Sequence, residues 1–183
     1  TTNFGIYVLQ ACYDTLIYSN TISTDGTGSS NHGLALQQSF NSSIINNTII
    51  TNGTSGVYGI KLESGTNGSV IDNNIITPRV GSGSHGIQIE TESSSNLLLN
   101  NNITADVGSG SFIIRDDTNS NILNYLVYNN SFGEIRWRDN GTESFLRNLT
   151  VESTSGLGLG LDRNLFIGDN VVALNTSAFS VDL

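Results

Sequence analysis

Apolar residues occupy alternate positions in a patch that recurs three times between residues 31 and 104. Leu34 and Leu36 form the first copy, with Ala35 between them. A period of two predicts a β-strand with one face turned inward and the other outward. The equivalent inward positions in the next two copies are Ile60 and Leu62, and Ile87 and Ile89.

A second patch follows each copy of the first and places an asparagine among its apolar residues. We expect this asparagine to face inward, so that amides on successive coils stack and hydrogen-bond to one another. The inward apolar pairs are predicted to be Ile45 with Ile49, Ile71 with Ile75, and Leu99 with Ile103. The predicted interior ladder consists of Asn20, Asn47, Asn73, Asn101 and Asn130.

The two patches repeat with a nearly fixed period. Gly33, Gly59 and Gly86 open the three copies at intervals of 26 and 27 residues. A period in this range is typical of a solenoid. Apolar residues spaced by two, with Gly and Asn between them, disfavour a helix. We therefore expect an all-β solenoid with coils of about 26–29 residues.

The regular coils are expected over residues 1–132, and residues 133–183 are expected to form shorter, irregular coils of the same solenoid. Gly5, Ile6 and Val8 fit the first patch one coil earlier, so the repeat begins in mid-coil. Solenoids need polar caps at their ends. We therefore expect the chain to be a segment of a larger protein, or its end to be covered by a neighbouring subunit.

Composition narrows the function. Asn (24), Ser (24), Gly (20) and Thr (18) make up almost half of the 183 residues, and the net charge is −9. Nucleic acid is a poor partner for this chain, because there is no basic stripe to neutralise phosphates. No run of roughly 18 apolar residues occurs, so no membrane span is predicted in this segment. The single Cys12 is expected to be a small buried or half-buried residue, with an intermolecular disulfide as the alternative.

The sequence contains nine Asn-x-Ser/Thr sequons, more than the five or six expected by chance from this composition. Asn41 and Asn67 are expected at the same place in consecutive coils, and Asn46 and Asn129 are expected to face outward because each precedes a ladder asparagine. Outward sequons predict N-glycosylation and an extracellular or cell-surface location. The candidate glycosylation sites are Asn41, Asn46, Asn52, Asn67, Asn102, Asn129, Asn140, Asn148 and Asn175.

The pattern HG-I-x-I followed by I-x-N-N-x-I resembles the right-handed parallel β-helix repeats of the carbohydrate-binding and sugar-hydrolase type, found in bacterial and archaeal surface proteins. The resemblance covers residues 1–132 well and residues 133–183 weakly. It implies three parallel sheets per turn and an interior asparagine ladder. It does not fix the function, because such a fold carries lyases, hydrolases, epimerases and proteins without enzymatic activity.

One cluster of charged residues could contact a sugar or Ca²⁺. In the expected register, Gln37, Glu63, Glu90 and Arg115 stack on the outer face, and Lys61 stacks on Gln88 and Ile113. The competing interpretation is a solvated face with cross-strand ion pairs, each worth about 0.2–1 kcal/mol. The candidate contact residues are Glu63, Glu90, Glu92, Arg115, Asp116 and Asp117.

Aromatic and imidazole side chains offer two further candidates. His32 and His85 lie two coils apart with Tyr58 between them, which is too far to share a metal ion, so we expect them to stack on Tyr58. Trp137 and the tyrosines could form a platform for a sugar, although a core position for Trp137 fits its alternation with Ile135 better. No metal site is predicted.

Two classes of function remain. The first is a structural or assembly module of a cell surface, surface layer or extracellular filament, whose partners are other copies or further segments of a larger chain. The second is a carbohydrate-active protein, which binds a polysaccharide or, less favoured, cleaves one as a lyase or hydrolase. The sequence favours the first class and no enzymatic activity, because no catalytic set is recognisable and Lys61 is the single lysine. A groove of aromatic and carboxylate side chains on one outer sheet would distinguish the second.

Overall fold

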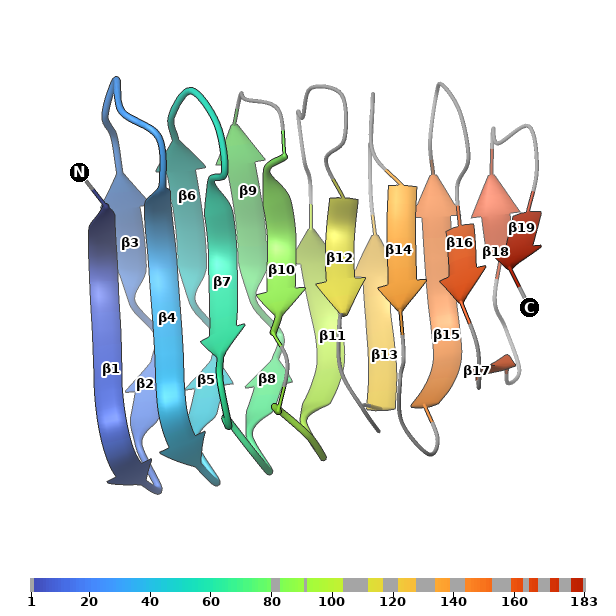
Figure 1. The fold of residues 1–183 in the computed structure, drawn as a ribbon, viewed down its shortest axis with the longest axis horizontal. Helices are drawn as coiled ribbons and strands as arrows, with labels where there is room; N and C mark the ends of the chain where they lie inside the picture. Colours follow the sequence, from blue (N-terminus) through green and yellow to red (C-terminus); the bar gives the residue numbers. More distant parts are fainter. Residues whose placement is uncertain are drawn as a thin grey trace.

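The computed structural model describes residues 2–79, 83–90 and 92–103 with their side chains and, from residue 112 onward, the backbone of the strands. All the described secondary structure is β-strand, as the period of two predicts. The strands stack side by side in successive coils along one long axis (Figure 1). Within the described residues, no helix is long and apolar enough to cross a membrane.

Two parallel sheets contain all the strands. The 8-stranded sheet is formed by β1 (Asn3–Tyr13), β4 (Asn31–Phe40), β7 (Tyr58–Glu63), β10 (His85–Ile89), β12 (Phe112–Asp116), β14 (Glu134–Arg138), β16 (Leu159–Asp162) and β19 (Phe179–Asp182). The 11-stranded sheet is formed by β2 (Leu16–Tyr18), β3 (Thr21–Thr24), β5 (Ser43–Ile45), β6 (Thr48–Asn52), β8 (Val70–Asp72), β9 (Ile75–Arg79), β11 (Leu97–Ile103), β13 (Ile122–Val127), β15 (Ser144–Glu152), β17 (Leu165–Ile167) and β18 (Val172–Leu174).

Each of the first three coils contributes three strands, for example β4, β5 and β6 in the second coil. Every strand pairs in parallel with its equivalent in the next coil, as in β4 with β7 and β7 with β10. The three expected faces are therefore present. Two of them belong to one hydrogen-bonded sheet, because β11 pairs with both β8 and β9.

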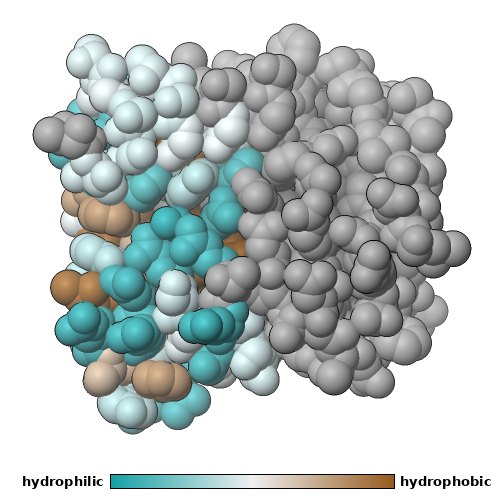
Figure 2. Space-filling view, in the orientation of Figure 1, coloured by the Kyte–Doolittle hydropathy of each residue, from teal (hydrophilic) through white to brown (hydrophobic). Residues whose placement is uncertain are grey.

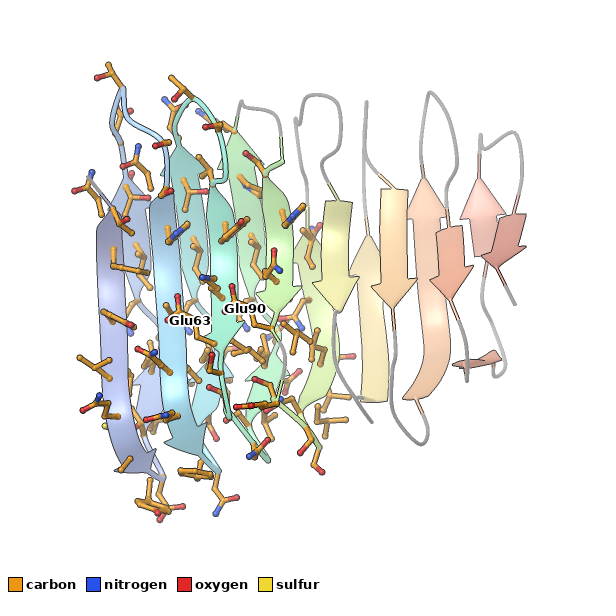
Figure 3. All side chains as sticks on the ribbon, in the orientation of Figure 1. Glu63 and Glu90 are labelled. Carbon is orange, nitrogen blue, oxygen red and sulfur yellow. The ribbon has the colours of Figure 1, made fainter. Side chains whose placement is uncertain are left out.

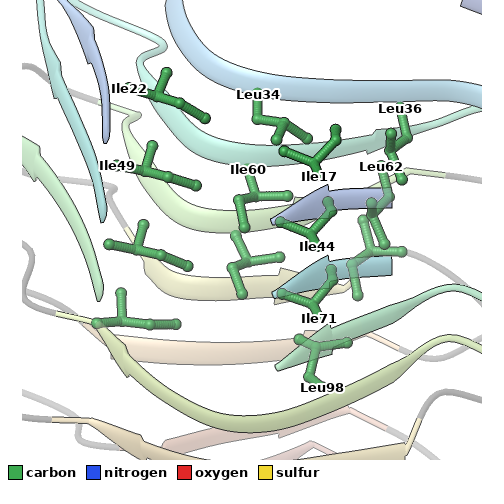
Figure 4. Close-up of a cluster of buried hydrophobic side chains, with 14 residues drawn as sticks. Ile17, Ile22, Leu34, Leu36, Ile44, Ile49, Ile60, Leu62, Ile71 and Leu98 are labelled. Atoms are coloured by element: carbon green, nitrogen blue, oxygen red, sulfur yellow. The ribbon is translucent and has the colours of Figure 1, made fainter. Parts of the chain in front are cut away.

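The core is a set of columns that run through the coils, shown in Figure 4. Leu34, Ile60 and Ile87 form one column, and each is fully buried as the alternation predicts. The other buried members of the core are Ile17, Ile22, Leu36, Ile44, Ile49, Leu62, Ile71, Ile76, Ile89, Leu98 and Ile103. Ile6 and Val8 of β1 pack against this cluster.

The second patch has a different register from the one predicted. Ile44 and Leu98 are buried where Ile45 and Leu99 were expected, and Ile76 replaces Ile75, which is 51% exposed. The cause is a turn residue with positive φ in each coil, which is Asn46, Asn73 or Asn100. This residue interrupts the alternation, so inward positions are spaced by three and then by two.

The same turn also changes which asparagines form the interior ladder, so the prediction of Asn73 is wrong. The buried amide in the third coil belongs to Asn74, whereas Asn73 is exposed and has a φ of 53°. Asn20, Asn47, Asn74 and Asn101 follow one another at intervals of 27 residues, each Nδ2 donating to the next Oδ1 at 2.9–3.1 Å. Asn130 lies outside the described residues.

Strands beyond residue 133 continue the same two sheets, with β14 pairing with β12 and β16. The irregular character expected for residues 133–183 stays a prediction. The inward orientation expected for Ile135 and Trp137 concerns side chains outside the described part of the structure.

Candidate functional site

The outer face of β1, β4, β7 and β10 carries the candidate site. Strand register places Tyr7, Ala35, Lys61 and Gln88 in one row across the four coils. Gln37 and Glu63 lie in the adjoining row. Hydrophilic side chains gather over the middle of this face (Figure 2). Within it, Glu63 is the last residue of β7 and Glu90 directly follows the neighbouring β10 (Figure 3). A strand directs alternate side chains outward, so the sheet holds these groups side by side.

A row of rings borders the polar row. Tyr58 lies between His32 and His85, with ring centroids 4.6 and 5.2 Å apart and interplanar angles of 2° and 6°. Phe4 extends the row, 5.1 Å from His32. The expected stacking on Tyr58 is confirmed. The two imidazoles lie on opposite faces of that ring, so they cannot bind one ion together.

His32 is neutral in this environment. Its Nδ1 accepts a hydrogen bond from the Tyr58 N–H at 3.3 Å, which fixes the tautomer with the proton on Nε2. Burial disfavours the imidazolium, and the charge of Lys61 acts in the same direction. Together they lower the His32 pKa from 6.5 to about 4, against a smaller opposing effect of Glu63.

Lys61 is shared between two carboxylates. Its Nζ lies 2.8 Å from Glu63 Oε1 and 2.9 Å from Glu90 Oε1. The ammonium also lies 5.7 Å from the centroid of the Tyr58 ring. Burial lowers the Lys61 pKa, but the hydrogen bonds and charges of Glu63 and Glu90 outweigh it, so the pKa is raised.

Tyr7 connects this ion pair to the first coil. Its hydroxyl lies 3.1 Å from Glu63 Oε2 and also contacts Gln37 Oε1, so its one proton is shared between two acceptors. Ala35 occupies the row position between Tyr7 and Lys61 and is fully buried. Burial and the neighbouring Glu63 carboxylate raise the pKa of the Tyr7 phenol. Sequence reasoning missed Tyr7, although its register with Ala35 and Lys61 would have placed it here.

The predicted charged cluster is not one site. Arg115 lies opposite Gln88 and Asp116 opposite Ile89, so Arg115 is in the row of Lys61 and not in that of Glu90. Ile113 therefore does not stack on Gln88, and Ile114 pairs with Ile87. This coil lacks the glycine that marks the register in earlier coils, and the predicted pairing is wrong by two residues. A shift of two keeps Arg115 on the same face of the strand but moves it to the next row.

Glu92 belongs to a different place from the ion pair. It is exposed, has a φ of 68°, and lines a hollow at the edge of the coils with Phe40 and Asn67. Asp117 lies outside the described residues. Among the residues that the structure describes, no three His, Cys, Asp or Glu side chains converge in the manner of a metal site. Glu63 and Glu90, the carboxylates offered for Ca²⁺, both contact the Lys61 ammonium instead.

Cys12 is half-buried, as predicted. Its Sγ lies 3.6 Å from the carbonyl oxygens of Leu9 and Gln10, in the range of weak thiol hydrogen bonds.

The sequons differ in their surroundings. Asn41 and Asn46 are exposed turn residues with φ of 52° and 58°, so the outward orientation of Asn46 is confirmed. The Nδ2 of Asn52 donates to Asp25 Oδ1 at 3.0 Å. The Oδ1 of Asn102 is buried without a hydrogen-bond partner in the described part of the chain.

Asn41 and Asn67 are not equivalent. Asn67 forms a bridge with Phe40, so Asn41 is the neighbour of Gly68 in the next coil. The cause is again a positive-φ turn residue, since Asn41 and Gly68 both have this backbone conformation. The side chains of Asn129, Asn140, Asn148 and Asn175 lie outside the described residues.

These features define the class of protein as a parallel β-solenoid with a polar outer face. The sequence matches the family described as the right handed beta helix region over residues 1–151, and the chain therefore belongs to that family. No curated protein and no solved structure matches the chain.

Proposed function

We propose that this chain is a structural β-helix module of an extracellular surface, surface layer or filament, with N-linked glycans on its turns. The observation that carries the proposal is the Lys61 network. The single lysine of the chain is held between Glu63 and Glu90, and Tyr7 is engaged with Glu63. Groups that bind one another in this way stabilise a face and are not disposed to act as acid and base on a substrate.

The exposed sequons support the extracellular part of the proposal. Asn41 and Asn46 are exposed residues on turns, which is the kind of position at which N-linked glycans are attached. Asn41 follows β4 and Asn46 follows β5. The inward side chains of these strands, such as Leu36 and Ile44, are buried, so a glycan on either asparagine would lie outside the core. Parallel pairing of coil on coil is also a geometry that further coils or neighbouring copies can extend.

The test uses protein from its native source. Cell fractionation should place it at the cell surface or in the medium, and its intact mass should exceed 19.5 kDa by that of several glycans. Electron microscopy of the native surface should show it in an array or filament. An unmodified mass together with an intracellular location would overturn the proposal. A glycosylated but free monomer would remove the assembly role alone.

The row of rings favours a second candidate, which is polysaccharide binding along the solenoid axis. His32 and His85 are buried, but Tyr7 and Phe4 form a stacked pair at the end of the row, beside the Gln37 amide and the Glu63 carboxylate. An accessible ring beside such polar groups is the combination expected of a sugar-binding face. A neutral polymer fits best, because the net charge of −9 repels acidic ones.

Retention on microcrystalline cellulose and on chitin tests this candidate. Tyr7→Ala should weaken retention, because Tyr7 is 39% exposed and stacks on Phe4 at 4.3 Å. The matched control is Tyr18→Ala, which removes a 56% exposed tyrosine from β2 in the other sheet. Lack of retention on both polymers, or equal loss in both variants, would remove the candidate.

A further inference from the structure

A hollow of about 460 Å³ lies where the first sheet ends and the chain turns toward the second. Phe40 provides an apolar ring, and Gln38, Ser64 and Glu92 provide polar groups. A volume of this size fits a small ligand, and the mixture of one ring with several hydrogen-bonding groups suits a sugar. None of the residues that line the hollow belongs to the Lys61 network.

Asn67 lines the same hollow and belongs to the sequon Asn67-Gly68-Ser69. Its Oδ1 accepts hydrogen bonds from the N–H of Ser94 at 2.6 Å and from the Ser94 hydroxyl at 2.9 Å. These two bonds hold the amide with its oxygen toward the next coil. Within the described residues, Nδ2 makes no hydrogen bond, and Nδ2 is the atom to which an N-linked sugar is attached.

Phe40 is held in place beside this amide. A parallel bridge joins Phe40 to Asn67, which puts the two side chains in adjacent register positions. The Phe40 ring also stacks on Tyr13, with centroids 5.0 Å apart and planes at 19°. The apolar face of a sugar ring packs well on a flat aromatic side chain of this kind. Asn67 is half-buried, and the exposed sequon residues Asn41 and Asn46 do not line this hollow.

We propose that the hollow seats the first sugar of a glycan on Asn67, with one face of the sugar against the Phe40 ring. The inference rests on the proposed glycosylation and adds that this glycan, unlike those on Asn41 and Asn46, is part of the fold. Attachment forms a bond between Nδ2 and C1 of the sugar. It breaks the bond from C1 to the phosphate of an activated sugar donor, and the proton lost from the amide leaves with that phosphate. The glycosylation machinery of the host supplies the donor.

The test is a thermodynamic cycle on the whole chain. Wild type and Phe40→Ala are each prepared from the native host, with glycans, and from a host without N-glycosylation. The glycans should reduce the unfolding equilibrium constant of wild type about three- to tenfold, and this gain should fall below about twofold in Phe40→Ala. Because the cycle subtracts the effect of the substitution itself, any loss of packing by Phe40→Ala cancels.

Two further variants make the result specific. Phe40→Leu keeps an apolar side chain but removes the flat ring, and it should behave like Phe40→Ala. Tyr18→Ala, which does not alter the hollow, should keep the full gain. Peptide mapping of the native protein reads the occupancy of each sequon.

The outcomes separate the two proposals. Glycans on Asn41 or Asn46 with an unmodified Asn67 would overturn this inference and leave the proposed function standing. A glycan on Asn67 whose stabilisation is unchanged in Phe40→Ala would overturn the seat while supporting glycosylation. A native protein without any glycan would overturn this inference, and if it were also intracellular it would overturn the proposed function as well.

Discussion

Each inner asparagine satisfies several backbone and side-chain groups that the turn would otherwise leave unpaired. Asn74 Oδ1 accepts from both the N–H and the Nδ2 of Asn47, at 2.9 and 3.1 Å. Asn74 Nδ2 donates to the carbonyl of Ile44 at 2.9 Å and to Asn101 Oδ1 at 2.9 Å. Buried groups of this kind cost free energy when they lose their partners, so the ladder stabilises the turn in every coil that it passes through.

Replacing Asn74 should therefore lower the free energy of unfolding much more than replacing its neighbour Asn73. Asn74→Leu should lower the free energy of unfolding by about 1–3 kcal/mol or more, because the Asn47 N–H and the Ile44 carbonyl lose partners. Asn73→Gly is the control, since glycine accepts the φ of 53° and the lost side chain is exposed. Urea unfolding measures the free energy of unfolding of both variants, and the loss should be larger for Asn74→Leu. A larger loss for Asn73→Gly would contradict the register of the ladder.

His32 should make stability depend on pH. Its pKa is lowered from 6.5 to about 4 in the folded protein, so the unfolded chain binds a proton first as the pH falls. Above about pH 6.5, His32 is neutral in both the folded and the unfolded chain and does not make stability depend on pH. Between about pH 6.5 and 4, protonation of the unfolded chain should lower the free energy of unfolding by roughly 3 kcal/mol.

His32→Phe tests this dependence, because phenylalanine keeps a ring beside Tyr58 and cannot be protonated. Urea midpoints at pH 7, 5.5 and 4 should fall less steeply in the variant than in wild type. At pH 7 the variant should be somewhat less stable than wild type, because the Tyr58 N–H loses its Nδ1 acceptor. Parallel pH profiles for both proteins would show that His32 is not the group responsible.

The residue scale is where sequence reasoning succeeded least. The pattern predicted an inward asparagine in each coil, and Asn47 and Asn101 are buried as expected, whereas Asn20 in the first coil is exposed. It selected Asn73 over Asn74 because both are asparagines and the alternation seemed continuous. The positive φ of Asn73 shifts the register by one residue, and no side-chain type in the pair reveals which of them adopts it.

At the scale of the strands, glycine sets how closely the two sheets approach. A Cβ on Gly33 would lie 2.3 Å from Ile49 Cγ2 and 2.6 Å from the carbonyl oxygen of Gly59. Gly5 and Gly59 face the same restriction from Ile22 and Ile76. Glycine at Gly5, Gly33 and Gly59 is thus required by contact with both the opposite strand and the next coil.

Gly33→Ala should destabilise the fold by about 1–3 kcal/mol, because the added methyl group overlaps a side chain and a backbone oxygen. Gly65→Asn provides the control. Its φ is 80°, which asparagine tolerates, and a Cβ there would meet nothing closer than 3.9 Å. Thermal unfolding of the two variants should show a large shift for the first and a small one for the second. Equal shifts would mean that close approach at Gly33 does not limit the packing.

The same glycines explain which strands the sequence could position. Where Gly33, Gly59 and Gly86 mark the repeat, the predicted inward residues of the first patch are all buried. β12 has no such glycine, and its register with β10 was predicted one row away from the pairing that is present. The predicted charged cluster required Arg115 to lie opposite Glu90, so the error in the register of β12 also made that prediction wrong. Long-range pairing of this kind is set by the turns between the strands, which the alternation alone does not specify.

At the scale of the whole molecule, the columns of the core make stability a property of neighbouring coils. Each buried side chain contacts equivalents in the coils before and after it, as in the column of Ile22, Ile49, Ile76 and Ile103 (Figure 4). Solenoids of this type behave approximately as one-dimensional arrays, in which each unit depends on its nearest neighbours. A defect in one coil should therefore weaken the adjacent coils most.

Two adjacent isoleucines allow this to be tested with one type of substitution. Ile76 is fully buried, and Ile75 is 51% exposed on the same strand. Ile76→Ala should lower the free energy of unfolding by about 2–5 kcal/mol, whereas Ile75→Ala should change it by about 0.5 kcal/mol or less.

Hydrogen exchange should then show where the defect acts. In Ile76→Ala, amides of β6 and β11 should lose the most protection, because these strands pair with β9 on either side. Amides of β1 and β3, which do not pair with β9, should be affected least. Uniform loss of protection along the chain would show instead that the solenoid unfolds as one cooperative unit, and Ile75→Ala provides the reference profile against which the two outcomes are distinguished.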